Sequence, residues 1–307
     1  MIKRYYTSGS TPAIIETAKT QTGNWINVES PTKEELETLV ATYNLVPGHL
    51  EDALDEDEVP RLETEGEQMY IYARFALRER DGDFETFPLL IITLKNTIIT
   101  VASRHVSALE PFTSGKIPVS TKDHTRLILL IMQRLTEQYD ALIDKTSRKI
   151  KAVRHRLRTH AVTNQDFVDF VMIEDELNEF LTALQPNNAV LRRLLVGKRL
   201  DAEDQDLIED ALLMNEQSIE KCNTNIKSII GVRDAHSSIS DNSLNQTMKV
   251  LTVATLGMAI PNMIFGIYSM NVETPFQHTL GAFWIIVSFT SIVLVVVMWF
   301  GRKKNIF

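Results

Sequence analysis

An uncharged C-terminal segment, residues 280–300, limits what this chain can fold into more than any other feature. It reads LGAFWIIVSFTSIVLVVVMWF, and a helix needs about 20 apolar residues to cross a bilayer core. We therefore predict a transmembrane helix there. Residues 250–268 are also uncharged, although Pro261 and several polar residues interrupt the run. Because transmembrane helices tolerate such residues, we predict a first transmembrane helix over residues 250–270.

The two predicted spans are joined by a short outer loop, residues 271–279, so both chain ends share one side of the membrane. Lys249 precedes the first span, and the second is followed by a basic tail, residues 301–307, whereas the loop has no Lys or Arg. The positive-inside rule then predicts cytoplasmic termini in a multi-pass protein of the cytoplasmic membrane. The N-terminal residues lack the apolar run of a cleavable signal, so we expect a cytosolic N-terminal region.

Residues 1–118 combine the patterns of strands and helices. Segments rich in β-branched and aromatic residues predict strands at residues 25–28, 69–77, 87–94 and 97–103. Thr32 and Glu35 form a capping-box pair before a helix that we expect to end near Tyr43. The sequence thus predicts a cytosolic α/β domain over residues 1–118.

After Pro118 the sequence becomes helical. We expect a cytosolic helical region over residues 119–202, with one helix over about residues 122–158 and another over about residues 165–195. From about Glu203 to Met270 few residues could break a helix. The stalk over residues 203–249 and the first span are therefore expected to form one helix on the order of 100 Å long. Such a rod needs packing partners.

Composition excludes several classes of function. The chain has 32 Lys+Arg against 40 Asp+Glu, whereas nucleic-acid binding needs clustered basic residues, so we expect no nucleic-acid partner. The single cysteine, Cys222, cannot form a disulfide framework or a thiolate-rich metal site. The sequence has no P-loop, GxSxG or Rossmann motif. We therefore expect neither an enzyme nor an organic cofactor.

The histidines show no paired metal-ligand spacing. Most are expected at the surface, and the loop residue His278 is a candidate ligand for a softer metal such as Zn²⁺ or Co²⁺. The seven are His49, His105, His124, His155, His160, His236 and His278.

A stripe of small and polar residues runs along the long predicted helix. Steps of three and four residues give Gly231, Asp234, Ser238, Asp241, Asn245, Met248, Thr252, Thr255, Ala259, Asn262, Gly266 and Ser269. The corresponding seam of a soluble coiled coil is apolar. Two interpretations compete: the small residues allow close helix packing in the membrane, or the stripe lines a water-filled pore enclosed by a symmetric ring of chains.

The two acids of the stripe favour the pore. Asp234 and Asp241 would form carboxylate rings at the cytoplasmic mouth, which is typical of a cation pathway. The carboxamides and hydroxyls beyond them would bind water around an ion, and Mg²⁺ gives up its water reluctantly. A hydrated divalent cation is therefore the expected substrate.

The chain also resembles the CorA family of magnesium channels over its whole length. The resemblance rests on a long helix entering the membrane, a second span, a basic tail, a loop with Glu273, and the sequence Tyr268-Ser269-Met270-Asn271. It implies a CorA-like funnel of five chains. Met270 and Asn271 match the Met and Asn of the family's Gly-Met-Asn signature, whose Asn ring binds hydrated Mg²⁺ at the outer mouth as a selectivity filter.

Two further positions follow from this resemblance, and one departs from it. Asn245 and Asp234 resemble the polar and acidic residues that the family places toward the cytoplasmic end. Ser269 stands where the family has Gly, and it adds a Cβ and a hydroxyl where Gly could adopt a positive φ without cost. The substitution is either tolerated, or it alters ion preference or weakens conduction.

Two acid-rich segments remain, and such runs are usually solvated faces. The functional interpretation comes from the resemblance, in which Mg²⁺ between cytosolic domains holds the channel closed, and it makes Asp210 and the neighbouring Glu209 candidate regulatory metal ligands. The segments contain Glu51, Asp52, Asp55, Glu56, Asp57 and Glu58, and Glu203, Asp204, Asp206, Glu209 and Asp210.

The stripe and the two spans predict a ring of chains in the lipid bilayer that passes Mg²⁺ into the cell. The resemblance implies that this ring is a homopentamer and that cytosolic Mg²⁺ gates it. Two alternatives stay open: a zinc, cobalt or nickel transporter on the same scaffold, and a non-conducting Mg²⁺ sensor or scaffold. The predicted path starts at Asn271 and passes Asn262, Thr255, Thr252, Asn245, Asp241 and Asp234.

Overall fold

The computed structural model describes residues 1–7, 14–17, 24–78, 82, 84–159, 164–197, 200–276 and 279–303. They fall into two compact units, unit 1 at Met1–Ile230 and unit 2 at Gly231–Phe307. Part of the outer loop, including His278, and the basic tail beyond residue 303 lie outside the described residues.

Unit 1 is built on a seven-stranded sheet with the order β2-β1-β3-β7-β6-β5-β4. β3 and β7 pair in parallel, and every other neighbouring pair is antiparallel. The strands are β1 (Ile2–Thr7), β2 (Ile14–Glu16), β3 (Asn24–Glu29), β4 (Leu62–Glu65), β5 (Gln68–Arg78), β6 (Phe84–Thr93) and β7 (Thr97–Ala102).

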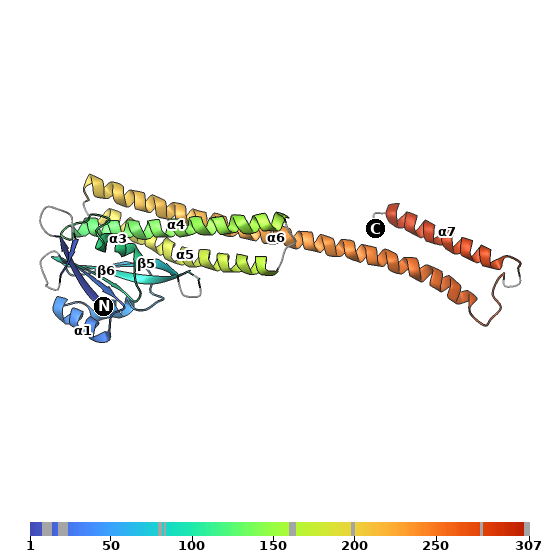
Figure 1. Cartoon of the computed structure of the whole chain (residues 1–307), viewed down its shortest axis with the longest axis horizontal. Helices are drawn as coiled ribbons and strands as arrows, with labels where there is room; N and C mark the ends of the chain where they lie inside the picture. The colour runs from blue at the N-terminus through green and yellow to red at the C-terminus, as the bar shows by residue number, and fades with distance from the viewer. Residues whose placement is uncertain are drawn as a thin grey trace. The chain divides into compact units, whose positions relative to one another are not determined.

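Helices cover both faces of this sheet (Figure 1). On one face, α1 (Lys33–Tyr43) and α2 (Pro47–Asp52) pack over Val28 and Tyr72 through Leu39 and Leu50. Side chains alternate between faces along a strand, so Ile71 and Trp25 belong to the other core. That core is closed by α4 (His124–Thr159), α5 (Asn164–Gly197) and the first part of α6, together with η1 (Ser107–Leu109) and α3 (Glu110–Thr113).

The longest helix, α6 (Ala202–Tyr268), has 67 residues and confirms the prediction of one continuous helix. Within unit 1 its buried residues recur every three or four positions, as expected for a helix packed along one face: Asp204, Ile208, Ala211, Asn215, Ser218, Cys222 and Ile229. Several polar members of this seam have partners: Asp204 pairs with Arg126, and the Ser218 hydroxyl donates to Asp140 at 3.3 Å. The Asn215 amide donates to the Leu184 carbonyl at 2.9 Å.

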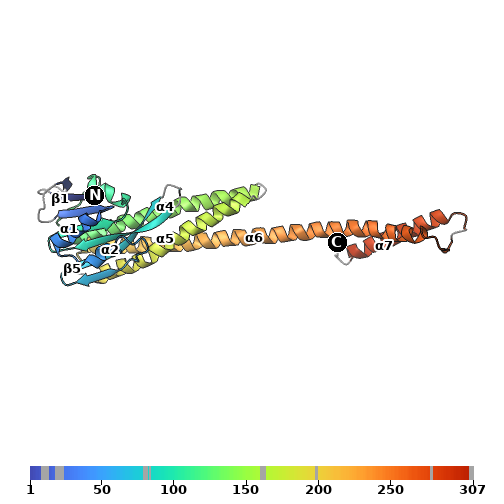
Figure 2. The ribbon, with the colours of Figure 1, turned by 90° about the horizontal axis from the view of Figure 1, so that it is seen from below.

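Unit 2 contains the rest of α6 and α7 (Ala282–Lys303), which runs back beside it in both views (Figures 1 and 2). α6 and α7 each contain a segment that is long and apolar enough to cross a membrane. None of the α6 segment and only 6% of the α7 segment is buried. This distribution differs from that of a core helix in a soluble protein.

The predicted α/β class, the four predicted strands and the long helices are confirmed. The capping box at α1 is also present, and α1 ends at Tyr43 before Asn44, whose φ is 53°. Strands β1, β2 and β4 were not predicted, because they lie at or near the sheet edges and are only partly buried, so they need no continuous apolar run. The helices α4 and α5 share a core with the sheet, so unit 1 continues past residue 118 to Ile230.

Candidate functional site

The stripe of small and polar residues lies entirely within unit 2. Each of its twelve side chains or glycine positions is exposed. The stripe comprises Gly231, Asp234, Ser238, Asp241, Asn245, Met248, Thr252, Thr255, Ala259, Asn262, Gly266 and Ser269. Asp234 and Asp241 therefore have no partner element over them in the described part of this unit.

The opposite side of α6 faces α7. In the apolar part of α6, the partly buried residues are Val253, Gly257, Ile260, Pro261, Ile264 and Tyr268. At 3.6 residues per turn, they lie on the side of the helix away from Thr255 and Asn262. The covered positions of α7 follow a matching spacing: Ala282, Ile286, Val287, Thr290, Val293, Leu294 and Val297. The polar face of α6 thus remains uncovered when α7 packs on the other face.

The threonines of the stripe present oxygen acceptors rather than free protons. The hydroxyl of Thr252 donates to the Met248 carbonyl, and that of Thr255 donates to the Leu251 carbonyl, each at 2.8 Å. A hydroxyl that gives its proton to the preceding turn keeps its oxygen lone pairs for other partners. Such an oxygen suits a cation or the water bound to one.

α6 ends at Tyr268, where the predicted selectivity segment begins. Backbone hydrogen bonds continue the turn: the Ser269 N–H donates to Phe265 O at 3.0 Å, and the Met270 N–H donates to Ile267 O at 3.3 Å. The Tyr268 hydroxyl donates to the Pro275 carbonyl at 3.2 Å, which ties the start of the loop to a later part of it. Met270, Asn271 and Glu273 are exposed.

Ser269 fits this helix end without strain. It is not among the described residues with positive φ, so the position does not need the conformational freedom of Gly. Its hydroxyl donates to the Gly266 carbonyl at 2.8 Å, which satisfies one of the carbonyls that a helix end leaves without an intrahelical partner. The backbone therefore supplies no reason for Ser269 to disturb the segment.

Both ends of α7 carry aromatic side chains suited to a membrane interface. Trp284 and Phe283 stack edge to face at its start, with ring centroids 5.4 Å apart. At its end, the Lys303 ammonium lies 5.0 Å from the centroid of Trp299. Aromatic residues at headgroup level and basic residues beyond them are typical of transmembrane helices.

The acid-rich segments contain several paired side chains. Asp52 and Glu58 bind Arg61, and Glu56 binds Arg104 at 3.0 Å. Asp204 is buried and lies 3.1 Å from the Arg126 guanidinium; burial, with Asp201 and Asp123 nearby, raises the pKa of Asp204. The expectation of solvated faces is therefore wrong for Asp204, which packs into unit 1.

The candidate regulatory acids Glu209 and Asp210 are both exposed on α6. Glu209 accepts a hydrogen bond from Gln205 at 2.8 Å. Among the described residues, neither acid belongs to a group of three or more potential metal ligands within this chain.

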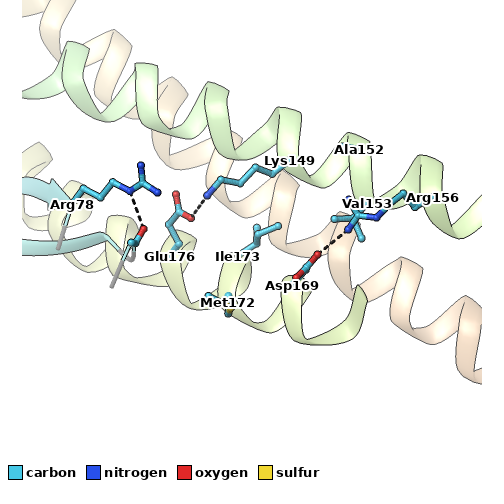
Figure 3. Close-up of a pocket in the computed structure, with 10 residues that line it drawn as sticks. Arg78, Lys149, Ala152, Val153, Arg156, Asp169, Met172, Ile173 and Glu176 are labelled. Carbon is cyan, nitrogen blue, oxygen red and sulfur yellow. Dashed lines mark hydrogen bonds and ion pairs between the residues drawn. The ribbon is translucent and has the colours of Figure 1, made fainter. Parts of the chain in front are cut away.

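A pocket of about 420 Å³ lies beside α4 and α5 and is lined by Arg78, Lys149 and Arg156 among others (Figure 3). Two of its basic groups pair with acids: Lys149 with Glu176 at 3.1 Å, and Arg156 with Asp169 at 2.8 Å. Arg78 donates to the Gly82 carbonyl at 3.1 Å. The charges of Lys149 and Arg156 are therefore already neutralised by carboxylates of α5.

The histidines depart from expectation at one position. His49 is 7% exposed and belongs to the interior of unit 1, whereas most histidines are expected at the surface. His160 and His278 lie outside the described residues. The burial of His49 could not be predicted from local sequence, because His49 lies on α2 and its neighbours Tyr70 and Tyr72 lie on β5.

Comparisons with known proteins agree with this architecture. Residues 20–303 match the profile of a family described as CorA-like Mg²⁺ transporter protein. The cobalt/magnesium transport protein CorA of Methanocaldococcus jannaschii is 26% identical over 291 residues, which cover 92% of this chain and 90% of that protein.

Two solved structures have the same fold. The complete structure of the CorA magnesium transporter from M. jannaschii has a TM-score of 0.85 at 23% identity and covers 99% of this chain and 98% of its own. The full-length CmaX protein has a TM-score of 0.80 at 16% identity, with 98% and 97% covered. From the match over residues 20–303 and the two apolar helices, we conclude that this chain is a membrane protein belonging to the family of CorA-like Mg²⁺ transporter proteins.

Proposed function

We propose that this chain forms a homopentameric channel that passes hydrated Mg²⁺ through the cytoplasmic membrane into the cell, with both termini in the cytoplasm. The observation that carries the proposal is the uncovered polar face of α6, which runs from Gly231 to Ser269 on the side away from α7 in the apolar segment. Transport of magnesium by named relatives supports the choice of ion. The number five rests on the resemblance to the family.

Exposure along α6 supports assembly from several copies. Every residue from 237 to 252 is exposed, including Ile239 (68%) and Leu244 (63%). A helix without a covered face gains nothing from tertiary packing, which supplies most helical stability in proteins. A ring of chains would cover the apolar side chains and enclose the stripe, since two spans cannot enclose a pore alone.

The stripe would handle Mg²⁺ with its water attached. Mg²⁺ dehydrates reluctantly, so the Asn271 carboxamides at the outer mouth would bind the ion through its water shell. Asn262, Thr255, Thr252 and Asn245 offer further amide and hydroxyl oxygens along the path. Rings of Asp241 and Asp234 would attract the cation toward the cytoplasmic exit.

Cytosolic Mg²⁺ would close the channel by bridging chains. Glu209 and Asp210 are exposed in a single chain and would face acids of a neighbouring copy. Without the ion, like charges would repel and loosen the ring. Asp210→Asn is expected to keep the channel open at Mg²⁺ concentrations that close the native one.

The test is Mg²⁺ influx into liposomes that contain the purified full-length chain. Asn271→Ala should abolish most influx because it removes the ring at the outer mouth, whereas the neighbouring loop variant Val272→Ala should conduct normally. Ser269→Gly should change influx little, since the backbone at Ser269 has no positive φ. Equal influx through Asn271→Ala and the native chain would contradict the proposal.

The same assay separates the alternatives. Relatives named cobalt/magnesium transport protein favour Co²⁺ as the competing ion. If Co²⁺, Ni²⁺ or Zn²⁺ enters while Mg²⁺ does not, the chain is a transporter of those ions. If no divalent cation enters, a sensor or scaffold role replaces the channel.

A further inference from the structure

A histidine of unit 1 is held in a fixed position at the edge of the sheet. His49 lies on α2, is 7% exposed, and stacks on Tyr70 with ring centroids 3.8 Å apart. Its Nδ1 lies 2.8 Å from the hydroxyl oxygen of Tyr72. Stacking and this hydrogen bond together define the plane of the ring and the direction of its other nitrogen.

The hydrogen bonds of Tyr72 identify the tautomer. The Tyr72 hydroxyl lies 3.1 Å from the His49 backbone carbonyl, which can only accept, so the hydroxyl proton is donated there. A hydroxyl has one proton, so His49 must supply the proton of the 2.8 Å contact from Nδ1. In the neutral ring, Nε2 then carries a lone pair.

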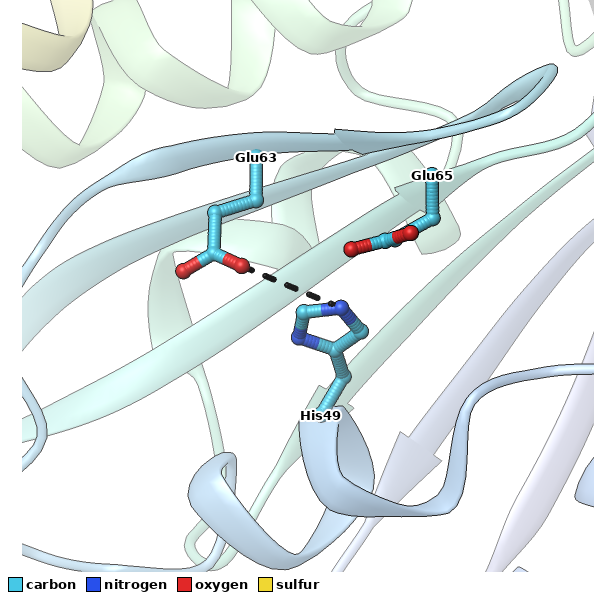
Figure 4. A group of neighbouring side chains, drawn as sticks. All are labelled: His49, Glu63 and Glu65. Atoms are coloured by element: carbon cyan, nitrogen blue, oxygen red, sulfur yellow. Dashed lines mark ion pairs between the residues drawn. The ribbon is translucent and has the colours of Figure 1, made fainter.

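That lone pair faces two carboxylates. Glu63 and Glu65 are two residues apart on β4, so their side chains leave the strand on the same side. The Nε2 atom lies 4.0 Å from Glu63 Oε2, and one ligand atom from each of the three residues lies within 4.8 Å of the others (Figure 4). In the described part of the chain, Nε2 makes no hydrogen bond.

The surroundings are negatively charged. Arg61 is the nearby cation, and its guanidinium binds the other oxygen of Glu63, Oε1, as well as Asp52 and Glu58. One guanidinium therefore serves three carboxylates, and Glu65 adds a fourth. An excess of negative charge around a neutral imidazole nitrogen favours a divalent cation.

We propose that His49, Glu63 and Glu65 form a binding site for a divalent transition-metal ion, with Zn²⁺ as the best match. One imidazole and two carboxylates suit Zn²⁺, with water completing the shell, whereas Mg²⁺ prefers oxygen ligands alone. Ligand atoms around a tetrahedral Zn²⁺ are about 3.4 Å apart, so the glutamates need to close by only about 1 Å. Tyr72 positions the ring, as hydrogen-bonded partners do for metal-binding histidines. This site belongs to unit 1 and is separate from the stripe.

The test measures Zn²⁺ and Co²⁺ binding by the full-length chain in detergent. Bound Co²⁺ is followed by the visible absorption of its tetrahedral complex, and Zn²⁺ affinity by competition. Because other sites in the chain can also bind these ions, the signal of interest is the difference between native and variant chains. His49→Gln should remove one equivalent of bound metal, and excess Mg²⁺ should not displace it.

Because His49 is buried, His49→Gln could lose metal binding by disturbing the fold, so variants of exposed residues are also needed. Glu65→Gln changes an exposed side chain and should weaken Zn²⁺ binding about tenfold or more, while the matched variant Glu67→Gln, two residues away in the following turn, should bind normally. Tyr72→Phe should weaken binding about 10- to 100-fold, the usual effect of losing such a partner. Native affinity in both His49→Gln and Glu65→Gln would overturn the site and leave His49 as an ion-pair partner of Glu63.

Discussion

The two units of this molecule place large apolar side chains in opposite ways. In unit 1, Trp25 is fully buried, packs against Tyr5 and Phe112, and donates its indole N–H to Thr100 at 3.0 Å. In unit 2, Trp284 is 70% exposed and contacts Phe283. We expect water around the first unit, and lipid and other chains around the second. Exposed apolar side chains in unit 2 therefore indicate that lipid or another chain covers them, and they do not indicate poor packing.

The largest expected effect separates these two tryptophans. Trp25→Ala should lower the free energy of unfolding of unit 1 by about 3 to 5 kcal/mol, because it leaves a cavity and removes the indole N–H that donates to the Thr100 hydroxyl oxygen. Trp284→Ala should change it by about 0.5 kcal/mol or less. Urea titration of the full-length chain in detergent measures both, and equal losses would show that the comparison is mistaken.

A smaller effect separates the two faces of α6 within unit 2. Ile264→Lys places a charge on the α7-facing side and should cost about 2.5 to 3.5 kcal/mol on insertion. Thr255→Lys places the same charge on the stripe, where pore water would solvate it, and should insert nearly as well as the native chain. The fraction of protein that resists alkaline extraction from membranes reports insertion. A stripe that faced lipid would make Thr255→Lys equally harmful.

The smallest effect concerns an exposed charge network in unit 1. His105 lies 2.7 Å from Glu29 and 2.9 Å from Glu110, and these hydrogen bonds raise its pKa. A raised pKa means that the stabilisation is complete below the unfolded value of about 6.5 and is lost as the pH rises through the folded value. Since the His105 side chain is 55% exposed, the loss should not exceed about 1 kcal/mol.

Thermal unfolding across this pH range provides the check. His105→Gln should remove this part of the pH dependence, whereas His155→Gln, on an exposed position of α4, should retain it. A native pH profile in His105→Gln would mean that the network does not contribute.

Local signals made much of the fold predictable. Thr32 and Glu35 defined the start of α1 because a capping box needs only neighbouring residues. The long helices followed from their periodicity and lack of breakers. The edge strand β4 was missed because its sequence, Leu-Glu-Thr-Glu, carries no apolar run. Such a strand forms through pairing with β5, and pairing is a tertiary property.

The candidate sites divide in the same way. The stripe could be predicted because its residues share one helix and a fixed spacing, although its role as a pore remains a prediction. The cluster of His49, Glu63 and Glu65 could not be predicted, because His49 lies on α2 and the glutamates lie on β4, and these elements meet only in the folded chain. The hydrogen bond of the Ser269 hydroxyl also depends on where α6 ends.

The central claim, that ions pass along the stripe, is tested most directly by blocking the path chemically. Thr255→Cys and Ile264→Cys channels in liposomes would be treated with a membrane-impermeant cationic thiol reagent during Mg²⁺ influx. The native Cys222 should not react with the reagent, because it is buried and burial raises the pKa of its thiol to about 12. We predict that the reagent blocks influx through Thr255→Cys and leaves Ile264→Cys unchanged. Block of Ile264→Cys with Thr255→Cys unaffected would contradict the account.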